Sequence, residues 1–375
     1  MDFFIHTFEA VTWQNLVMMC VGGLLIYLAV KKEFEPNLLL PMGFGTILVN
    51  LPLSSAIDQI AGGKLIEGAL SMFFKIGIAT EIMPLLILIA VGAMCDFTPL
   101  LANPKMFLFG AAAQFGIFLT IVLAALLGYD IYEAASIGII GAADGPTSIY
   151  VSTRFAPNLL GPISVAAYTY MALVPLIQPP VILALTTKNE RRMKMPYADR
   201  PVSRRMLILF PILITILGGI VAPASVSLLG FVMFGNLLRV SGVTDRLSNA
   251  AQNELANIVT ILLGFAIAAT MTGEKFVNVN TLVIIAMGLV AFVLDTAGGV
   301  LTAKLLNLFL PKDKRINPMI GAAGISAFPM SARTIQRLGQ KADPSNHLLM
   351  HAVGANVAGQ IGSVLAGGAL LAYLG

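Results

Sequence analysis

Long apolar segments recur along this chain, and they restrict its fold more than any other feature of the sequence. A helix that crosses the hydrocarbon core of a membrane needs about 20 predominantly apolar residues. The candidate crossings are residues 11–30, 38–53, 81–94, 105–127, 131–150, 163–185, 206–229, 254–270, 282–310 and 347–374. A run at 225–240 is a further candidate, and the segment 65–80 is expected to lie along the interface or to form a half-crossing. We therefore expect an all-α polytopic membrane protein with about 10 to 12 crossings.

The composition excludes most other classes of protein. Hydrophobic residues make up 57 % of the chain and charged residues 11 %, whereas a soluble domain carries about 25 % charged residues. This balance excludes a soluble enzyme, a disordered chain, a nucleic-acid-binding module and a disulfide scaffold. Cys20 and Cys95 lie in apolar runs and are expected to be small buried residues rather than a disulfide or a metal pair.

Positive charges predict which ends of the crossings face the cytoplasm. Lys31 and Lys32 follow the first apolar run, so the positive-inside rule places that end in the cytoplasm and the N-terminus outside. The loop 188–205 holds seven basic and two acidic residues and is the clearest cytoplasmic loop, and a basic turn at 312–315 is expected on the same side. Such a loop could also dock an acidic soluble partner. It divides the chain into two membrane halves, residues 1–187 and 206–375.

Two segments form an internal repeat. Residues 139–155 (IIGAADGPTSIYVSTRF) and 319–335 (MIGAAGISAFPMSARTI) share Ile-Gly-Ala-Ala at an offset of 180 residues, and each continues with Gly, Pro, small hydroxyl residues and an arginine. The similarity resumes downstream, at MALVPLIQPP from Met171 and at MHAVGANVAGQ from Met350. An odd number of crossings between the copies would insert them in opposite orientations. We therefore expect two inverted repeats.

Each repeated segment is expected to contain a broken helix near the membrane midplane. Gly145 and Pro146 in the first copy remove an amide donor and unwind the helix. In lipid, backbone groups freed in this way are tolerated only where they line a cavity or are buried in protein. Paired broken segments in the two halves of a membrane protein point to a binding site. The alternative is that Gly and Pro only kink packed helices.

Asp144 is the most informative single residue. It lies at the first break among apolar neighbours, where an ionisable side chain costs at least ~2.5 kcal/mol and is usually functional. Thr147 and Ser148 add hydroxyls to its carboxylate and to the freed carbonyls. This hard oxygen set suits sodium or a proton better than a transition metal. The alternative is a buried aspartate that only caps the second half-helix.

The second copy has no acid at the matching place, where Gly324 stands. It offers Asn317, Ser326 and Arg333 instead. An arginine beside a broken helix can hold a carboxylate with two hydrogen bonds, although it could also extend to the membrane surface. Downstream, Asn356 is a neutral oxygen donor in a Gly-rich helix, or else a residue that hydrogen-bonds a neighbouring helix.

Two further residues carry open alternatives. Tyr170, just before the MALVP stretch, is either a proton donor or an interface or packing residue. Asp295, in FVLDTAGGVL, is either a second ion ligand or the start of a half-helix. The three histidines do not form a metal-ligand set.

With these motifs, the chain resembles the β subunits of the sodium-pumping biotin-dependent decarboxylases, a family that includes the oxaloacetate, methylmalonyl-CoA, glutaconyl-CoA and malonate enzymes. The matching stretches are residues 141–150, 170–180, 317–333 and 351–363. The similarity extends over most of the chain, and its compact length is closer to the acyl-CoA members. The functional residues that the resemblance implies are Asp144, Tyr170, Asn317, Ser326, Arg333 and Asn356.

The resemblance implies an activity. A carboxyltransferase α subunit moves CO2 onto biotin held by a biotin carrier protein, and this membrane subunit then decarboxylates the carboxybiotin and drives sodium outward while a proton is consumed. On this hypothesis Arg333 positions the carboxylate, and Asp144 holds sodium and exchanges it for the proton, with Tyr170 as a further catalytic group. Asn317 and Ser326 contribute to both the carboxybiotin and the sodium site, and Asn356 to the sodium site.

The resemblance also implies partners and a location. We expect a small membrane-anchored subunit of the γ/δ type, the inner membrane of a bacterium and no nucleic acid, and a homo-oligomer is left open. Biotin is not expected on this chain: Met193-Lys194-Met195 is the tripeptide found around biotinylated lysines, but its 18-residue loop has no room for a carrier domain.

The main rival function is a secondary cation–proton antiporter or solute transporter, with the same repeats and buried aspartate but no decarboxylation. A passive membrane anchor is a weaker rival, because it does not require the buried Asp144.

Overall fold

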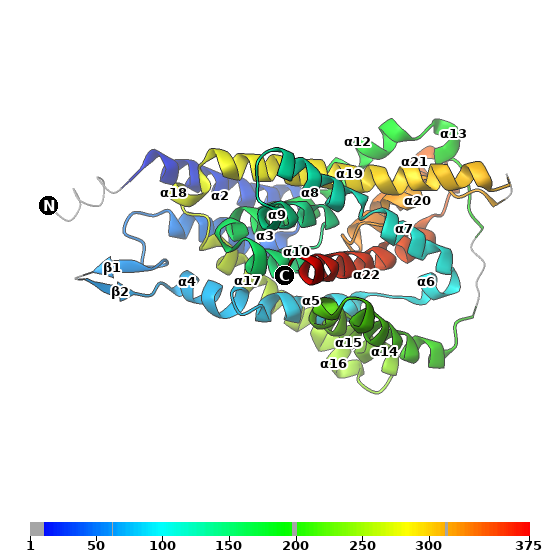
Figure 1. Cartoon of the computed structure of the whole chain (residues 1–375), viewed down its shortest axis with the longest axis horizontal. Coiled ribbons are helices and arrows are strands. Elements are labelled where there is room, and N and C mark those ends of the chain that lie inside the picture. The colour runs from blue at the N-terminus through cyan, green and yellow to red at the C-terminus, as the bar shows by residue number, and fades with distance from the viewer. Residues whose placement is uncertain (1–10, 62, 197–200, 312–313) are drawn as a thin grey trace.

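The structure is a computed structural model that describes residues 11–61, 63–196, 201–311 and 314–375. These residues are almost entirely helical, apart from one short β-hairpin (Figure 1). The expected all-α polytopic membrane fold is therefore confirmed. The expected outside position of the N-terminus concerns residues 1–10, which lie outside the described residues, as do Lys312 and the segment 197–200 of the basic loop.

The first half contains twelve α-helices, two strands and four short 3-10 or π segments in its described residues. In chain order these are α2 (Trp13–Lys32), α3 (Pro36–Val49), β1 (Gln59–Ala61), β2 (Lys64–Ile66), α4 (Ala69–Phe73), η1 (Phe74–Ile78), α5 (Ile82–Met94), α6 (Thr98–Ala102), η2 (Pro104–Met106), α7 (Phe107–Ala112), α8 (Phe115–Leu126), α9 (Ile131–Gly138), η3 (Ile139–Ala142), α10 (Gly145–Phe155), η4 (Pro157–Leu159), α11 (Leu160–Ala172), α12 (Val174–Leu185) and α13 (Lys188–Arg191).

The second half follows the basic loop. Its elements are α14 (Arg204–Val221), η5 (Pro223–Ser225), α15 (Val226–Ser241), α16 (Asp245–Ala250), η6 (Ala251–Leu255), α17 (Ala256–Ala268), α18 (Gly273–Phe276), α19 (Val279–Phe309), α20 (Met319–Ala322), α21 (Met330–Ala342) and α22 (Leu349–Leu374).

Fewer helices than expected are long enough to cross a membrane. Among the described residues, seven helices are long and apolar enough to cross a membrane, and the number is nine if each of two bent helix pairs counts as one span. The bent pairs are Ala69–Ile78 with Ile82–Met94, at 63°, and Pro157–Ala172 with Val174–Leu185, at 69°. The expected crossing at 38–53 is the 14-residue α3, and the one at 131–150 is broken into shorter helices.

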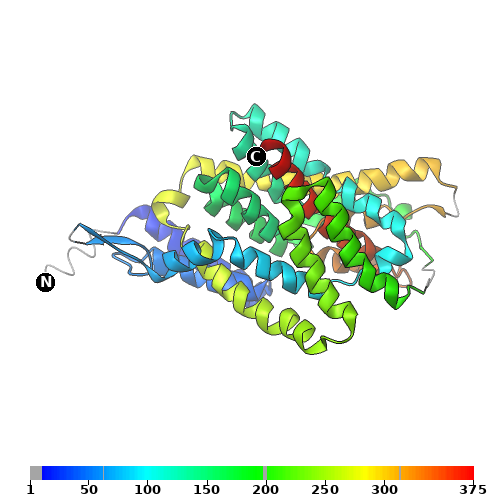
Figure 2. The same cartoon turned by 60° about the horizontal axis from the view of Figure 1, so that its bottom comes forward.

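The segment before α5 begins with a hairpin that the apolar pattern does not predict. Strands β1 and β2 pair antiparallel, with Gln59 opposite Ile66. Lys75 then bridges Asp58 at 2.9 Å and Glu67 at 2.8 Å, which ties the hairpin to η1. The hairpin protrudes at one end of the molecule (Figure 2).

The packing places apolar side chains outside and polar ones inside. Leu126, Val221 and Phe309 are 78–80 % exposed, whereas Asp144 is 3 % and Asp295 0 % exposed. Exposed aliphatic side chains on long helices suit a lipid environment, and buried acids there face the protein interior.

The two halves are packed into one another. Helix α5 packs on α15, α3 on α17, α7 on α22 and α8 on α19, so each of these pairs joins one half to the other. Helix α19 runs along much of the molecule, and α22 passes through its middle (Figure 1). The opposite orientation of the two repeats stays a prediction.

Candidate functional site

The first repeated segment is broken at Ala143 and Asp144. The 3-10 turn η3 ends at Ala142, Ala143 takes a left-handed conformation with φ 52°, and α10 begins at Gly145. Pro146 lies in the first turn of α10, where its missing amide would have no helical partner. Left-handed backbone at a residue with a side chain costs about 1–3 kcal/mol and is concentrated at functional sites. The expected break in the first copy is therefore present.

The Asp144 carboxylate is buried and receives four hydrogen bonds. Oδ1 accepts one from the Thr147 amide at 3.3 Å, which caps α10 as the alternative interpretation predicted. Oδ2 accepts three, from the Thr147 hydroxyl at 2.8 Å, the Ser363 hydroxyl at 2.8 Å and the Gln360 amide at 3.1 Å. No cationic side chain in the described part of the chain pairs with it. A carboxylate without a countercharge is expensive to bury, so this one requires a cation or a proton.

The second repeated segment is also interrupted, and it meets the first. Between α20 and α21 the Ser326 amide and hydroxyl both donate to the Ala142 carbonyl, at 3.1 and 2.7 Å. The Ala322 carbonyl accepts from the Gln178 amide at 2.7 Å and from the Ser331 hydroxyl at 3.2 Å. Side chains therefore satisfy carbonyls that the two breaks leave without helical partners.

Helix α22 contacts both breaks along one face. Asn356, Gln360 and Ser363 are spaced i, i+4 and i+7, which places them on one side of the helix. The Asn356 amide donates to the Ile325 carbonyl at 2.6 Å, while its Oδ1 is buried with no hydrogen-bond partner among the described residues. A side chain at Gly359 would overlap the Gly324 backbone, so this glycine permits the close approach.

Helix α19 receives both copies of the Ile-Gly-Ala-Ala motif. Gly321 of the second copy lies against Gly299, and Gly141 of the first copy lies against Asp295, one turn earlier. Asp295 is fully buried in the middle of α19, so it does not start a helix of its own. Its Oδ1 accepts from the Ile117 amide near the start of α8, at 3.2 Å, and its Oδ2 has no partner in the described structure. The second-ligand alternative for Asp295 stays a prediction.

Comparison with the sequences of known proteins identifies the family of this chain. A family model described as "Na+-transporting oxaloacetate decarboxylase beta subunit" matches residues 14–374. The glutaconyl-CoA decarboxylase subunit beta of Acidaminococcus fermentans is 51 % identical over 368 residues, covering 98 % of this chain and 95 % of that protein. The methylmalonyl-CoA decarboxylase subunit beta of Propionigenium modestum is 49 % identical over 393 residues, covering 100 % and 99 %. The oxaloacetate decarboxylase beta chain of Klebsiella pneumoniae is 46 % identical over 412 residues, covering 96 % and 94 %.

The chain belongs to this family. The family membership confirms the resemblance, and it supports decarboxylation coupled to sodium transport over a transporter without chemistry.

Within this β-subunit family member, three of the predicted site residues come together. Asp144 and Ser326 lie at the two breaks, and Asn356 contacts the second break from α22. Tyr170 forms no hydrogen bond to these three residues in the described structure, because its hydroxyl donates to the Ile285 carbonyl of α19. Arg333 is exposed on α21, and its guanidinium has no hydrogen bond or ion pair within the described ranges.

Asn317 lies at the basic loop rather than at Asp144. Its side-chain amide donates to the Arg191 and Met193 carbonyls at 3.1 and 2.9 Å, and its Oδ1 accepts from the Met319 amide at 3.1 Å. Both ends of the side chain are therefore engaged in holding the loop to the start of the second repeated segment.

Sequence reasoning missed four residues of the site. Gln360 and Ser363 hold the Asp144 carboxylate, Gln178 satisfies the second break, and the ring of Tyr168 lies against Gly145 with its buried hydroxyl unpartnered among the described residues. The spacing of Gln360 and Ser363 from Asn356 was an available signal. Gln178 and Tyr168 lie in or beside the repeated MALVP stretch.

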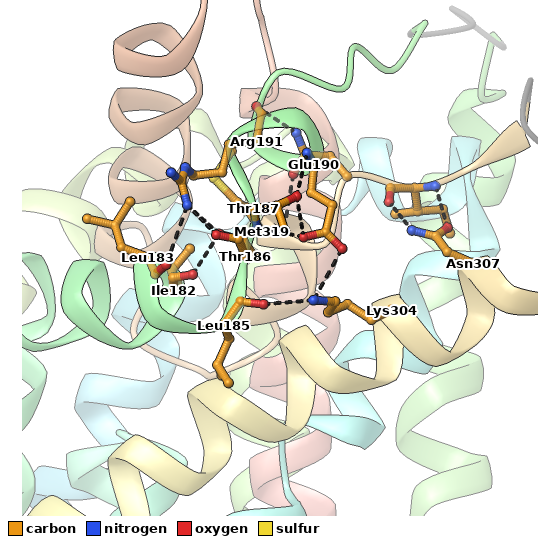
Figure 3. Close-up of polar contacts among 12 residues, drawn as sticks. Ile182, Leu183, Leu185, Thr186, Thr187, Glu190, Arg191, Lys304, Asn307 and Met319 are labelled. Atoms are coloured by element: carbon orange, nitrogen blue, oxygen red, sulfur yellow. Dashed lines mark hydrogen bonds and ion pairs between the residues drawn. The ribbon is translucent and has the colours of Figure 1, made fainter.

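Polar contacts also join the end of α12, the short helix α13 and α19 (Figure 3). Lys304 of α19 donates to the Leu185 carbonyl at 3.0 Å and pairs with Glu190 at 3.2 Å, and Arg191 donates to the carbonyl and hydroxyl of Thr186. Partial burial opposes ionisation of Glu190, but hydrogen bonds from Thr187 and Lys304 outweigh it and lower the pKa of this carboxyl. The ion pair is therefore present at neutral pH.

Proposed function

We propose that this chain decarboxylates carboxybiotin presented by a biotin carrier protein and couples that reaction to outward transport of sodium and consumption of a proton. The observation that carries the proposal is the Asp144 carboxylate, which is buried where the two broken segments and α22 meet and has no cationic partner among the described residues. The family membership supplies the class of reaction.

Sodium, the transported substrate, fits the oxygen atoms around this break. The Asp144 Oδ1 receives only one long hydrogen bond, and the Asn356 Oδ1 receives none from described residues. The Ser326 hydroxyl donates to Ala142, which leaves its lone pairs available. Carboxylate, amide and hydroxyl oxygens are ligands that hard cations prefer. We propose Asp144, Ser326 and Asn356 as the sodium ligands.

The chemistry requires one proton for each carboxybiotin. The N–CO2 bond breaks, CO2 leaves, and the electron pair stays on the ureido nitrogen, which then takes a proton. A carboxyl group at Asp144 can supply that proton after sodium has left, because sodium and a proton compete for the same oxygen atoms. Tyr170 stays a candidate for proton transfer, although its hydroxyl would first have to leave the Ile285 carbonyl.

Arg333 is proposed to position the carboxybiotin carboxylate. Its exposed guanidinium, beside the second break, is free of protein partners in the described ranges and could accept a carboxylate with two hydrogen bonds. The finer partners follow from the same proposal: a carboxyltransferase α subunit, a biotin carrier protein and a small γ/δ-type subunit, in the inner membrane of a bacterium.

The proposal is tested by measuring carboxybiotin decarboxylation of the reconstituted complex while sodium is titrated from near zero. We expect saturable activation in the wild type, and a loss of about 100-fold or more in Asp144→Asn, because the exchangeable carboxyl is removed. Asp130→Asn is the matched control, since Asp130 also caps a helix of the first half but is exposed.

Sodium activation retained in Asp144→Asn would remove this residue from the mechanism. No decarboxylation by the wild type at any sodium concentration, with active partner subunits, would favour a transporter without chemistry.

A further inference from the structure

A large cavity lies between the start of α7 and the end of α19. The end of α19 is at the right-hand end of Figure 1. Its volume is about 1110 Å³, and its walls come from the end of α6, η2, α7, α19, the residues after α19, the basic loop and the start of α22. None of the residues proposed for the sodium or carboxybiotin site lines it. The cavity therefore requires an explanation separate from the decarboxylation site.

Three cations line this cavity. Lys105 precedes α7, and Lys314 and Arg315 follow α19; all three are exposed, and within the described ranges none forms an ion pair. Both helices belong to candidate membrane spans, Pro104–Leu126 and Val279–Phe309. The three cations thus lie where the two spans end, at the level expected for lipid headgroups.

The wall on the membrane side is aliphatic. Leu108 and Ala111 of α7, Leu306 of α19 and Leu310, which directly follows α19, line the cavity. Leu108 is 45 % exposed, so the cavity continues into the outer surface of the α7 span. A ligand with a negatively charged head and a long apolar chain would satisfy both parts of this wall.

We propose that this cavity binds one anionic phospholipid, with its phosphate against Lys105, Lys314 and Arg315 and an acyl chain along α7 and α19. Basic pockets between membrane helices are known to recognise anionic headgroups. The inner wall includes Met195 and Pro196 of the basic loop, so the lipid would also contact the segment that joins the two halves. The biotin arm of the carrier is the competing occupant, but an opening on the lipid-facing side of a span favours a lipid.

The test measures binding of phosphatidylglycerol and phosphatidylcholine to the purified full chain in detergent, by native mass spectrometry and by the shift in thermal unfolding. We expect phosphatidylglycerol to bind and stabilise the wild type, and phosphatidylcholine and inorganic phosphate to have much smaller effects. The double variant Lys314→Gln/Arg315→Gln should bind phosphatidylglycerol about 25-fold more weakly, at about fivefold for each cation near the membrane surface.

A second variant tests the acyl-chain wall without changing charge. Ala111 is exposed and lines the cavity, so Ala111→Trp should fill the groove and also weaken binding of phosphatidylglycerol. The matched control is Lys31→Gln/Lys32→Gln, an exposed basic pair at the end of α2 that does not line the cavity, and it should bind phosphatidylglycerol as the wild type does.

Equal binding of phosphatidylglycerol by the Lys314/Arg315 variant and the wild type would overturn the proposal. An equal loss in the Lys31/Lys32 control would also overturn it, because the effect would then be general surface charge. If the cavity variants keep their lipid affinity but raise the concentration of carrier protein needed for decarboxylation, the cavity belongs to the carrier and the lipid proposal is wrong.

Discussion

Three of the buried oxygen atoms that the protein does not fully satisfy lie at or beside the broken segments. Asn356 Oδ1 and Asp295 Oδ2 have no hydrogen-bond partner among the described residues, and Asp144 Oδ1 has one long bond. A buried polar atom left without a partner costs about 1–3 kcal/mol, and more when it is charged. Asp144 lies at the first break, and Asn356 contacts the second. Asp295 accepts a hydrogen bond from the start of α8 and lies against Gly141 of the first repeated segment. A cation or a proton at the carboxylates would offset this cost, which supports the proposed ion site at the breaks.

The hydrogen bonds to Asp144 predict the effect of Ser363→Ala. Ser363 donates to the carboxylate at 2.8 Å, and its loss makes protonation of Asp144 more favourable at the expense of sodium. The sodium concentration for half-maximal decarboxylation should rise about tenfold, since a hydrogen bond to a charged group contributes about 1.5–3 kcal/mol. Ser136→Ala is the control, because that buried hydroxyl donates to its own helix at Tyr132. An unchanged sodium dependence in Ser363→Ala would show that this bond does not control the site.

Arg333→Lys tests the proposed carboxylate contact. Lysine keeps the charge but cannot form the two parallel hydrogen bonds of a guanidinium. In separate titrations of carboxybiotin and sodium, we expect kcat/KM for carboxybiotin to fall about tenfold. The sodium concentration for half-maximal decarboxylation should change little. Arg337→Lys is the control, one turn along the same exposed side of α21. If only the sodium dependence changed, the role assigned to Arg333 would be wrong.

Close backbone contacts between helices hold the broken segments in place. Gly299 of α19 lies against Gly321, and Gly359 of α22 lies against Gly324, so both contacts reach the second repeated segment. Small residues at such crossings let membrane helices approach until backbones touch. The second repeated segment is thus positioned by the continuous helices α19 and α22 rather than by its own short helices.

This packing predicts that Gly299→Ala destabilises the protein. A methyl group at Gly299 would overlap the Gly321 carbonyl oxygen, and overpacking of a close contact costs about 1–3 kcal/mol. Gly23→Ala in α2 is the control, because a methyl group there would meet no atom within 4 Å and alanine favours a helix by about 1 kcal/mol. The temperature of thermal unfolding in detergent should therefore be lower for Gly299→Ala and unchanged or higher for Gly23→Ala. A stable Gly299→Ala would mean that the crossing can separate without loss.

The sequence predicts elements better than it predicts contacts, for physical reasons. The first break was predictable because Gly145, Pro146 and Asp144 act within one turn of chain. The bend inside 163–185 was missed although Pro175 stands at the first turn of α12, since an apolar run alone does not distinguish one helix from two. Two partners of the Asp144 carboxylate, Gln360 and Ser363, come from α22, more than 200 residues away, and only tertiary packing brings them together.

At the scale of the whole molecule, the basic loop is attached to the second half at several points. Arg192 donates to the Ala342 carbonyl at 3.1 Å, and Lys194 pairs with Asp343 at 3.3 Å. Hydrogen bonds from Ser345, and then the bond from Lys194, lower the pKa of Asp343 to about 2, so this carboxylate is ionised at neutral pH. Because the pKa of Asp343 is lowered by folding, its contribution to the stability of the folded protein is present above about pH 4 and is lost as the pH falls toward 2. The basic loop is therefore attached to the second half by a hydrogen bond and an ion pair at neutral pH.

The family resemblance marks Asn317 as functional. Comparing Asn317 with Asn346 tests whether Asn317 acts only by holding the basic loop. Both side-chain amides donate to the Arg191 and Met193 carbonyls, at 2.9–3.1 Å from Asn317 and at 3.0 and 3.3 Å from Asn346. Each alanine variant should release the loop and speed its cleavage by trypsin about 5- to 30-fold, at about 1 kcal/mol for each lost hydrogen bond. Asn253→Ala, which removes only a bond to its own helical segment, should leave cleavage unchanged.

The sodium dependence of decarboxylation then separates two roles for Asn317. Because its side-chain oxygen accepts the Met319 amide and its nitrogen holds the loop, we expect Asn317→Ala and Asn346→Ala to lower turnover to a similar extent with similar half-maximal sodium. A rise in half-maximal sodium in Asn317→Ala alone would show that Asn317 acts as a sodium ligand in another conformation, since Asn346 controls for the loop. The two broken segments would then have to move during turnover, and the loop contacts described here would belong to one of at least two states of the pump.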